Sequence, residues 1–283
     1  MTASPFEMAH ASFYCGAFAK NDVRIEQTLK AVEAVVRRRL THYAHTGFGT
    51  PKAMPGDRVS FVSRWLPGVN EKFDSESLCP RDITGSWVLV NLDNIRTLPG
   101  LLSKRGAPFS GAVNISYLES SPMRKRVVTG FADLVVGTGC FHARLTSFPL
   151  LLQRNRTRQR LAEELKELER FRAFSEAHWK GNYDLLMRKK DEYVYDIDAH
   201  PLTGVTPDGQ AYPLELLWLN YWNDATAARL RFPDEKLDAP LKGLYERLPG
   251  GWLVKLTVEP TDLDKPADRE RLQWAYDRLA SGA

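Results

Sequence analysis

Cys140 and His142 are the first residues whose types and spacing could do chemistry. They are two apart, and in a strand that spacing points both side chains to one face, where a thiolate and an imidazole could form a nucleophilic pair. No third group is visible that would orient the imidazole or lower the pKa of the thiol. A buried cysteine beside an incidental histidine is therefore the simpler interpretation.

Paired aspartates are the second candidate. Asp196 with Asp198, and Asp262 with Asp264, could offer carboxylate oxygens to a hard cation. Neither pair is followed by the glycine and distal glutamate of a calcium loop, and Asp264 is placed to cap a helix that starts at Pro266. Capping and solvation therefore explain these acids without a metal.

The strong local signatures of enzyme families do not occur in the sequence. It contains no HExxH, GxSxG or GxxxxGK[ST], and after Gly137 and Gly139 the third glycine of a dinucleotide fingerprint is missing. His42 and His45 approach a zinc-ligand spacing but would need further ligands. We predict a protein that is not an enzyme and needs no cofactor or metal. Enzymes whose groups converge from distant positions have no local motif, so an enzyme of that kind stays an alternative.

Cysteine usage and hydropathy bear on the compartment. An odd number of cysteines without CxxC spacing argues against a disulfide framework and favours reduced, buried thiols at Cys15, Cys79 and Cys140. The N-terminal residues lack a basic stretch followed by an apolar one, and no apolar run reaches the roughly 18 residues of a membrane span. We expect a cytoplasmic protein that does not cross a membrane.

Charge is distributed unevenly along the chain. Residues 1–190 hold 29 basic and 18 acidic side chains, whereas residues 191–283 hold 10 and 17, so the two parts have net charges of +11 and −7. Such asymmetry can steer a charged partner to one part of a protein. The arginines between residues 154 and 160 are more typical of a solvated helix than of a nucleic-acid site, so DNA or RNA binding is a second alternative.

Hydrophobic periodicity predicts an α+β fold, with a mixed or antiparallel sheet and helices packed on it. In the first half we expect helices at 23–40 and 94–104, a loop-rich segment at 42–80, and strands at 11–18, 58–65, 86–92, 112–118 and 126–136. Asn21 and Asp22 are placed to cap the first of these helices.

The second half begins with a long amphipathic helix, expected near the middle of the chain at 153–190. Further on we expect strands at 192–197 and 252–257, a turn at 207–209, and helices at 225–230, 237–248 and 266–279. The whole chain, 1–283, is expected to be a single domain. It allows a subdivision into 1–150 and 191–283, joined by the long helix.

The last seventy residues resemble the C-terminal module of bacterial proteins of the immunity protein fifty-two type and of a related uncharacterised family. The resemblance rests on a WLNYW-like box, an FPD, a GGW strand ending in LT, a P-x-DLD-x-P turn, and a tyrosine in the closing helix. In this sequence these elements are Trp218 to Trp222, Phe232 to Asp234, Gly250 to Thr257, Pro260 to Pro266, and Tyr276.

The resemblance implies an immunity protein that binds and neutralises a cognate toxin by stoichiometric protein–protein interaction. The toxin would be a nuclease delivered by a type VI or contact-dependent system. Aromatic rings such as Trp218, Trp222 and Trp252 are more typical of a core than of an interface. Since a nuclease is basic where it meets phosphate, we expect the toxin to contact exposed acids. The candidates are Asp196, Asp198, Asp234, Glu235 and Asp238.

Overall fold

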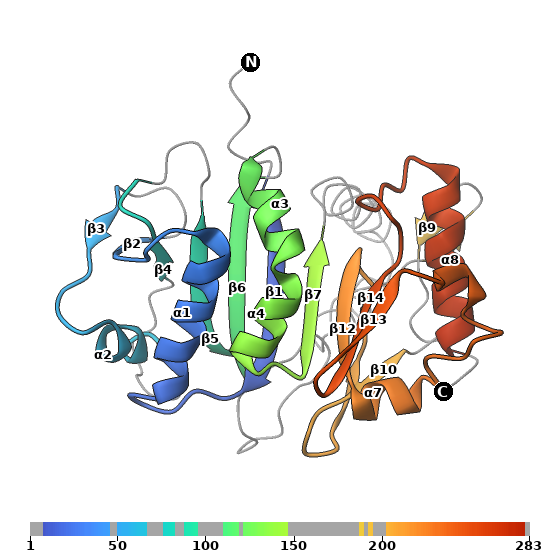
Figure 1. The fold of residues 1–283 in the computed structure, drawn as a ribbon, viewed down its shortest axis with the longest axis horizontal. Helices are drawn as coiled ribbons and strands as arrows, with labels where there is room; N and C mark the ends of the chain where they lie inside the picture. Colours follow the sequence, from blue (N-terminus) through green and yellow to red (C-terminus); the bar gives the residue numbers. More distant parts are fainter. Residues whose placement is uncertain are drawn as a thin grey trace, which may run out of the picture. The chain divides into compact units, whose positions relative to one another are not determined.

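The structure is a computed structural model, and it describes residues 8–45, 50–66, 76–82, 88–95, 110–118, 121–146, 187–189, 192–194 and 202–280. The chain divides into two compact units (Figure 1). The described residues up to Leu145 belong to the first unit, and those from Thr146 onward belong to the second. Both units combine helices with antiparallel strands, so the predicted α+β class is confirmed.

Strands in the first unit follow the order β7-β1-β6-β5-β4-β2-β3. Their bounds are β1 Met8–Gly16, β2 His42–His45, β3 Lys52–Ala53, β4 Glu76–Cys79, β5 Leu89–Ile95, β6 Ser110–Leu118 and β7 His142–Thr146. The pairs β1–β6, β6–β5, β5–β4, β4–β2 and β2–β3 are antiparallel. The predicted strands near residues 11–18, 86–92 and 112–118 are present with shifted ends, and Asn94 lies in β5 rather than in the helix expected from that residue onward.

Helices α1 (Val23–Val36), α3 (Pro122–Thr129) and α4 (Phe131–Thr138) cover one face of this sheet (Figure 1). Apolar side chains alternate along β1 and meet this layer, with the rings of Phe13 and Phe131 5.1 Å apart. Gly137 lets α4 approach α1 closely, because a Cβ there would lie 2.4 Å from the Cβ of Ala31. The core of the first unit thus lies between the helices and one side of the sheet.

Helix α1 begins as predicted but ends earlier. Asp22 is its N-cap and accepts a hydrogen bond from the amide of Arg24. The helix ends at Val36 because Arg37 takes a left-handed conformation, with φ of 54°. The guanidinium of Arg126 donates to the carbonyl oxygen of Val36 at 3.0 Å and so satisfies one of the terminal carbonyls. Arg37, Arg38 and Arg39 therefore lie beyond the helix.

Two predicted strands of the first unit are helices instead. The segment 126–136 was assigned to a strand for its valines, but Ser121 caps α3 with Pro122 at its start, and buried Met123 and Val127 follow helical spacing. The segment 58–65 forms α2 (Arg58–Ser63), whose N-cap Asp57 accepts from the amide of Ser60. Side-chain caps begin α2 and α3 where β propensity favoured strands, whereas α4 begins after Gly130 without a side-chain cap.

The second unit contains the strand order β13-β14-β12 and two separate hairpins, β8–β9 and β10–β11. Its elements are β8 Met187–Lys189, β9 Glu192–Val194, β10 Thr203–Val205, β11 Ala211–Pro213, β12 Leu219–Asn223, α7 Asp224–Arg229, the 3-10 helix η1 Ala239–Leu241, β13 Tyr245–Leu248, β14 Gly251–Lys255 and α8 Pro266–Ala280. The predicted elements around α7, β14 and α8 are confirmed within a few residues, and Asn223 is the N-cap of α7.

The prediction of a helix at 237–248 is wrong. Pro240 allows only the short helix η1, and Gly243 with φ of 78° reverses the chain into strand β13. The long amphipathic helix at 153–190 lies outside the described residues, except that Met187–Lys189 form strand β8 and contradict its C-terminal end. Within the described part, no helix is both long and apolar enough to cross a membrane.

Candidate partner-binding surface

Asp234 and Glu235 occupy a turn between α7 and η1 in the second unit. The Oδ1 atom of Asp234 accepts hydrogen bonds from the amides of Lys236 at 2.9 Å and Leu237 at 2.8 Å. These contacts, with the amide of Leu237 the stronger cause, lower the pKa of Asp234 below its ordinary value. Asp234 is therefore ionised at neutral pH, and Glu235 beside it is exposed. The turn thus carries one carboxylate held by backbone amides, that of Asp234, and a second, exposed one at Glu235.

Asp238 is buried, whereas Asp234 is half-buried and Glu235 is exposed. Its Oδ1 atom lies 3.1 Å from Nε of Arg278, and its Oδ2 atom accepts hydrogen bonds from Nη2 of Arg278 at 3.2 Å and from the amide of Asp234 at 2.7 Å. Its side chain is 0% exposed, so it cannot meet a partner on the surface. Asp238 instead fixes the acidic turn from inside. Asp196 and Asp198 lie outside the described residues.

The aromatic residues that carry the sequence resemblance form the core behind this turn. Trp218 and Trp222 are buried, as expected, and the indole N–H of Trp218 donates to the carbonyl of Thr257 at 3.1 Å. The ring of Phe232 lies 5.3 Å from that of Trp222 and 5.2 Å from that of Tyr245 in edge-on contacts. The tyrosine of the closing helix, Tyr276, accepts a hydrogen bond from the amide of Leu216. These residues therefore build the module rather than its surface.

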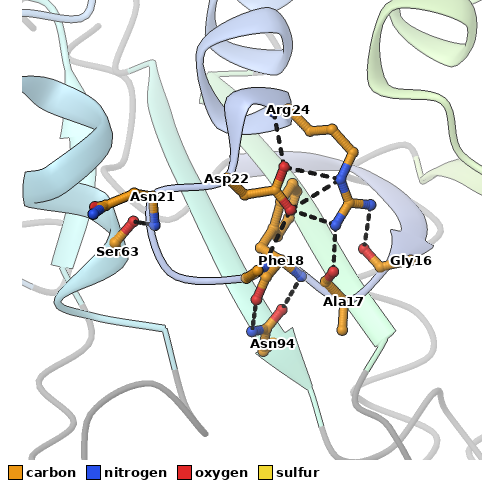
Figure 2. Close-up of polar contacts among 9 residues, drawn as sticks. Gly16, Ala17, Phe18, Asn21, Asp22, Arg24, Ser63 and Asn94 are labelled. Atoms are coloured by element: carbon orange, nitrogen blue, oxygen red, sulfur yellow. Dashed lines mark hydrogen bonds and ion pairs between the residues drawn. The ribbon is translucent and has the colours of Figure 1, made fainter.

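A loop of the first unit is also rigidly held, although its sequence gave no sign of it. Figure 2 shows the side-chain amide of Asn94 bound to both backbone groups of Phe18, with the amide nitrogen of Phe18 2.8 Å from Oδ1 and its carbonyl 2.7 Å from Nδ2. Asn94 of β5 thereby ties down the loop that follows β1, although β6 lies between these two strands in the sheet. The amide of Asn21 donates to the hydroxyl of Ser63 at 2.8 Å.

Arg24 and Asp22 close the same loop (Figure 2). The guanidinium donates to the carbonyls of Gly16 and Ala17, and it forms an ion pair with the carboxylate of Asp22. The hydrogen bond from Arg24 is the largest cause that lowers the pKa of Asp22 to about 2. Lys20 is exposed on this loop. A loop ordered in this way loses little conformational entropy when a partner binds to it.

The candidate pair Cys140 and His142 lacks the chemistry of an activated thiol. Burial raises the pKa of the Cys140 thiol to about 12, and its S–H contacts the carbonyl oxygen of Val135 at 3.7 Å. His142 is buried and stacks on the ring of Tyr14, with centroids 5.4 Å apart. At neutral pH the thiol is therefore protonated and weakly nucleophilic. Both residues fill the core of the first unit.

The residues considered as metal ligands have structural partners or lack further ligands. The amide of Asp264 donates to Oδ1 of Asp262, which makes that pair a local turn. His42 and His45 lie on β2, and an odd spacing in a strand points their side chains to opposite faces. Among the residues that the structure describes, no three His, Cys, Asp or Glu side chains gather where a metal could bind.

Comparisons with known proteins find one matching family, described as a domain of unknown function (DUF5953), over residues 206–281. This range contains the module with the aromatic core and the acidic turn. No curated protein matches the chain. Among solved structures, the chain is similar to the Pseudomonas aeruginosa T6SS protein PA0821, with 12% identity and a TM-score of 0.48, over 96% of this chain and 73% of that one.

Proposed function

We propose that this protein is an immunity protein that binds a cognate bacterial toxin and neutralises it as a stoichiometric complex. The proposal begins from the resemblance of residues 217–276 to immunity proteins of the fifty-two type. The observation that supports it is the acidic turn, where half-buried Asp234 and exposed Glu235 lie on a module whose residues Trp218, Trp222 and Tyr276 belong to the core. Recognition then falls to the acids, and packing falls to the aromatics.

Charge defines the partner that suits this turn. A toxin of the nuclease class carries basic side chains where it holds phosphate, and two neighbouring carboxylates attract such a surface and speed association. Because the turn is closed by Asp238 and Arg278 beneath it, binding requires little ordering of the acids. A specific interface of standard size buries roughly 1,200–2,000 Å² in total, so the turn would be one part of a larger contact.

Delivery by a type VI or contact-dependent system belongs to this proposal, as does action in the cytoplasm, where a nuclease meets its target. In this account the protein is a binder rather than an enzyme. The buried, protonated state of Cys140 supports that view, since the most chemically suggestive pair in the sequence is part of the core. Inhibition then needs no cofactor.

Co-expression with the toxin encoded beside this protein tests the proposal. Cells producing both proteins should grow, and the double variant Asp234→Lys/Glu235→Lys should lose most of that protection. Glu270→Lys is the matched control, because Glu270 is an exposed acid on α8, away from the turn in sequence, and the charge change is of the same kind. Equal growth with the turn variant and the control would reject the acidic turn as the docking site. Cell death with the unaltered protein would reject the immunity function for that toxin.

A further inference from the structure

Strand β13 ends its sheet, and the hydrogen-bond pattern shows which of its backbone groups face outward. The carbonyl of Leu244 accepts from the amide of Lys255 at 2.7 Å, and the hairpin closes at the pair Leu248 and Gly251. Hydrogen-bonded and non-hydrogen-bonded pairs alternate in an antiparallel ladder. The backbone groups of Glu246 therefore point to β14, whereas those of Tyr245 and Arg247 point away from the sheet.

The side chains of Tyr245 and Arg247 fold back from this edge, and no other described strand pairs with it. The ring of Tyr245 packs inward, 5.9 Å from that of Trp252. The guanidinium of Arg247 lies over the ring of Trp252 at 5.3 Å, donates to the carbonyl of Gly251 at 2.9 Å, and forms an ion pair with Asp224. Charged side chains usually guard an edge strand by standing out along it. Here the arginine is folded back over the sheet.

We infer that β13 is a docking edge, to which the toxin adds an extended strand that carries a lysine or arginine opposite Glu246. This inference rests on the proposed immunity function, and it adds a second toxin-binding surface to the acidic turn. The outward N–H and C=O groups of Tyr245 and Arg247 have no hydrogen-bond partner among the described residues, and they match an added strand. Glu246 is exposed and forms no ion pair with any described residue, so it offers an unmatched negative charge in the same strand.

A toxin strand fits this edge better than a second copy of the chain. Two copies that used all four outward groups would pair Tyr245 with Arg247 of the other copy, in antiparallel register. That register places the two copies of Glu246 directly opposite each other, and like charges in opposite positions destabilise a strand pair. The same carboxylate favours a strand with a basic residue at that position.

Two variants at position 247 separate the contribution of the backbone N–H to toxin binding from that of the side chain. Arg247→Pro and Arg247→Ala both remove the guanidinium, but only proline removes the outward N–H, which an edge strand tolerates. The affinity of each full-length variant for the purified toxin should be measured by calorimetry. The proline variant should bind at least about tenfold more weakly than the alanine variant, which corresponds to the loss of about one hydrogen bond.

Hydrogen exchange of the unaltered protein gives a readout that does not depend on a variant folding. The amides of Tyr245 and Arg247 should exchange more slowly once the toxin is bound. If the unaltered protein binds the toxin, but these amides stay unprotected or the proline and alanine variants bind equally, the docking edge is wrong and the immunity function stands. If the two amides are protected without toxin in a self-associated form, the occupant is a second copy and the inference is also wrong. If the unaltered protein does not bind, the proposed function itself fails.

Discussion

Asp238 and Arg278 form an ion pair inside the second unit, with Oδ1 of the carboxylate 3.1 Å from Nε of the guanidinium and side chains that are 0% and 5% exposed. Arg278 also donates to the carbonyl oxygen of Arg231 at 2.9 Å, so helix α8 is tied to the segment that leads into the acidic turn. The pair connects the closing helix of the module to the surface that we assign to toxin binding.

Arg278→Met is expected to lower the free energy of unfolding by about 3–5 kcal/mol, because the charge of the Asp238 carboxylate then stays buried without a counter-ion. Urea unfolding at neutral pH measures this loss. The double variant Asp238→Leu/Arg278→Met should recover most of it, since an apolar pair leaves no buried charge. A loss below about 1 kcal/mol in the single variant would show that the pair contributes little, as exposed pairs do.

The same buried carboxylate has a pH dependence with a defined sign. Burial raises the pKa of Asp238 above its ordinary value of 3.8, against the opposing effect of Arg278. An acid whose pKa is raised on folding stabilises the fold when it is protonated, and this contribution is lost as the pH rises through the folded pKa. The defect of Arg278→Met should therefore shrink as the pH falls to 4 and below. A defect that grows in acid would contradict the burial of this charge.

The lowered pKa of Asp22 predicts that the stability of the first unit depends on pH in the opposite sense. Arg24 holds the pKa of Asp22 at about 2, below its ordinary value of 3.8. The stabilisation is present above pH 3.8 and is lost as the pH falls through about 2. Asp22→Asn keeps an N-cap side chain but removes the charge, so its stability should change less with pH over this window. Urea midpoints of both proteins measured across it provide the check, and parallel curves would count against the prediction.

Asn94→Ala should loosen the loop shown in Figure 2, because the amide and carbonyl of Phe18 lose their hydrogen-bond partner. Leaving buried polar groups unpaired costs about 1–3 kcal/mol. The amide of Phe18 should exchange faster with solvent in the variant, and Asn94→Asp should restore only the contact to that amide. Unchanged exchange at Phe18 would mean that the loop is ordered by Arg24 alone.

The cysteines should be unreactive in the folded protein. Burial raises the pKa of Cys15 and Cys79 to about 11 and that of Cys140 to about 12, so the thiolate is scarce at neutral pH. A thiol reagent should label the unfolded chain fully and the native chain slowly. Cys140→Ala should leave protection against the toxin unchanged. Loss of protection by a variant that still folds would revive the reading of Cys140 as a reactive group.

Elements with a clear apolar stripe and a cap could be predicted from the sequence, and those decided by distant contacts could not. Asp22 before α1 and Asn223 before α7 are local signals, and both caps are present. The valines of α3 and α4 favour a strand by β propensity. That propensity is a weak guide here, because Ser121 and Pro122 start a helix. The shape of β13 depends on Gly243, whose left-handed φ is set by the fold of the whole module.

The candidate surface was predictable only in part. Acidic composition pointed to Asp234 and Glu235, and the structure places both on one turn. Acidic composition also pointed to Asp238, which is buried, because composition cannot distinguish an exposed acid from one that pairs with an arginine forty residues away. The outward groups of Tyr245 and Arg247 could not be predicted at all, because they follow from strand order and register.

Neutralisation of the toxin is best tested by titrating its nuclease activity with the purified protein. Activity should fall linearly and reach zero at one equivalent, because a tight complex is stoichiometric. The Asp234→Lys/Glu235→Lys variant should require a large excess, whereas Glu270→Lys should behave like the unaltered protein. Nuclease activity that persists undiminished in the presence of excess protein would contradict the claim that this protein neutralises its toxin by binding it.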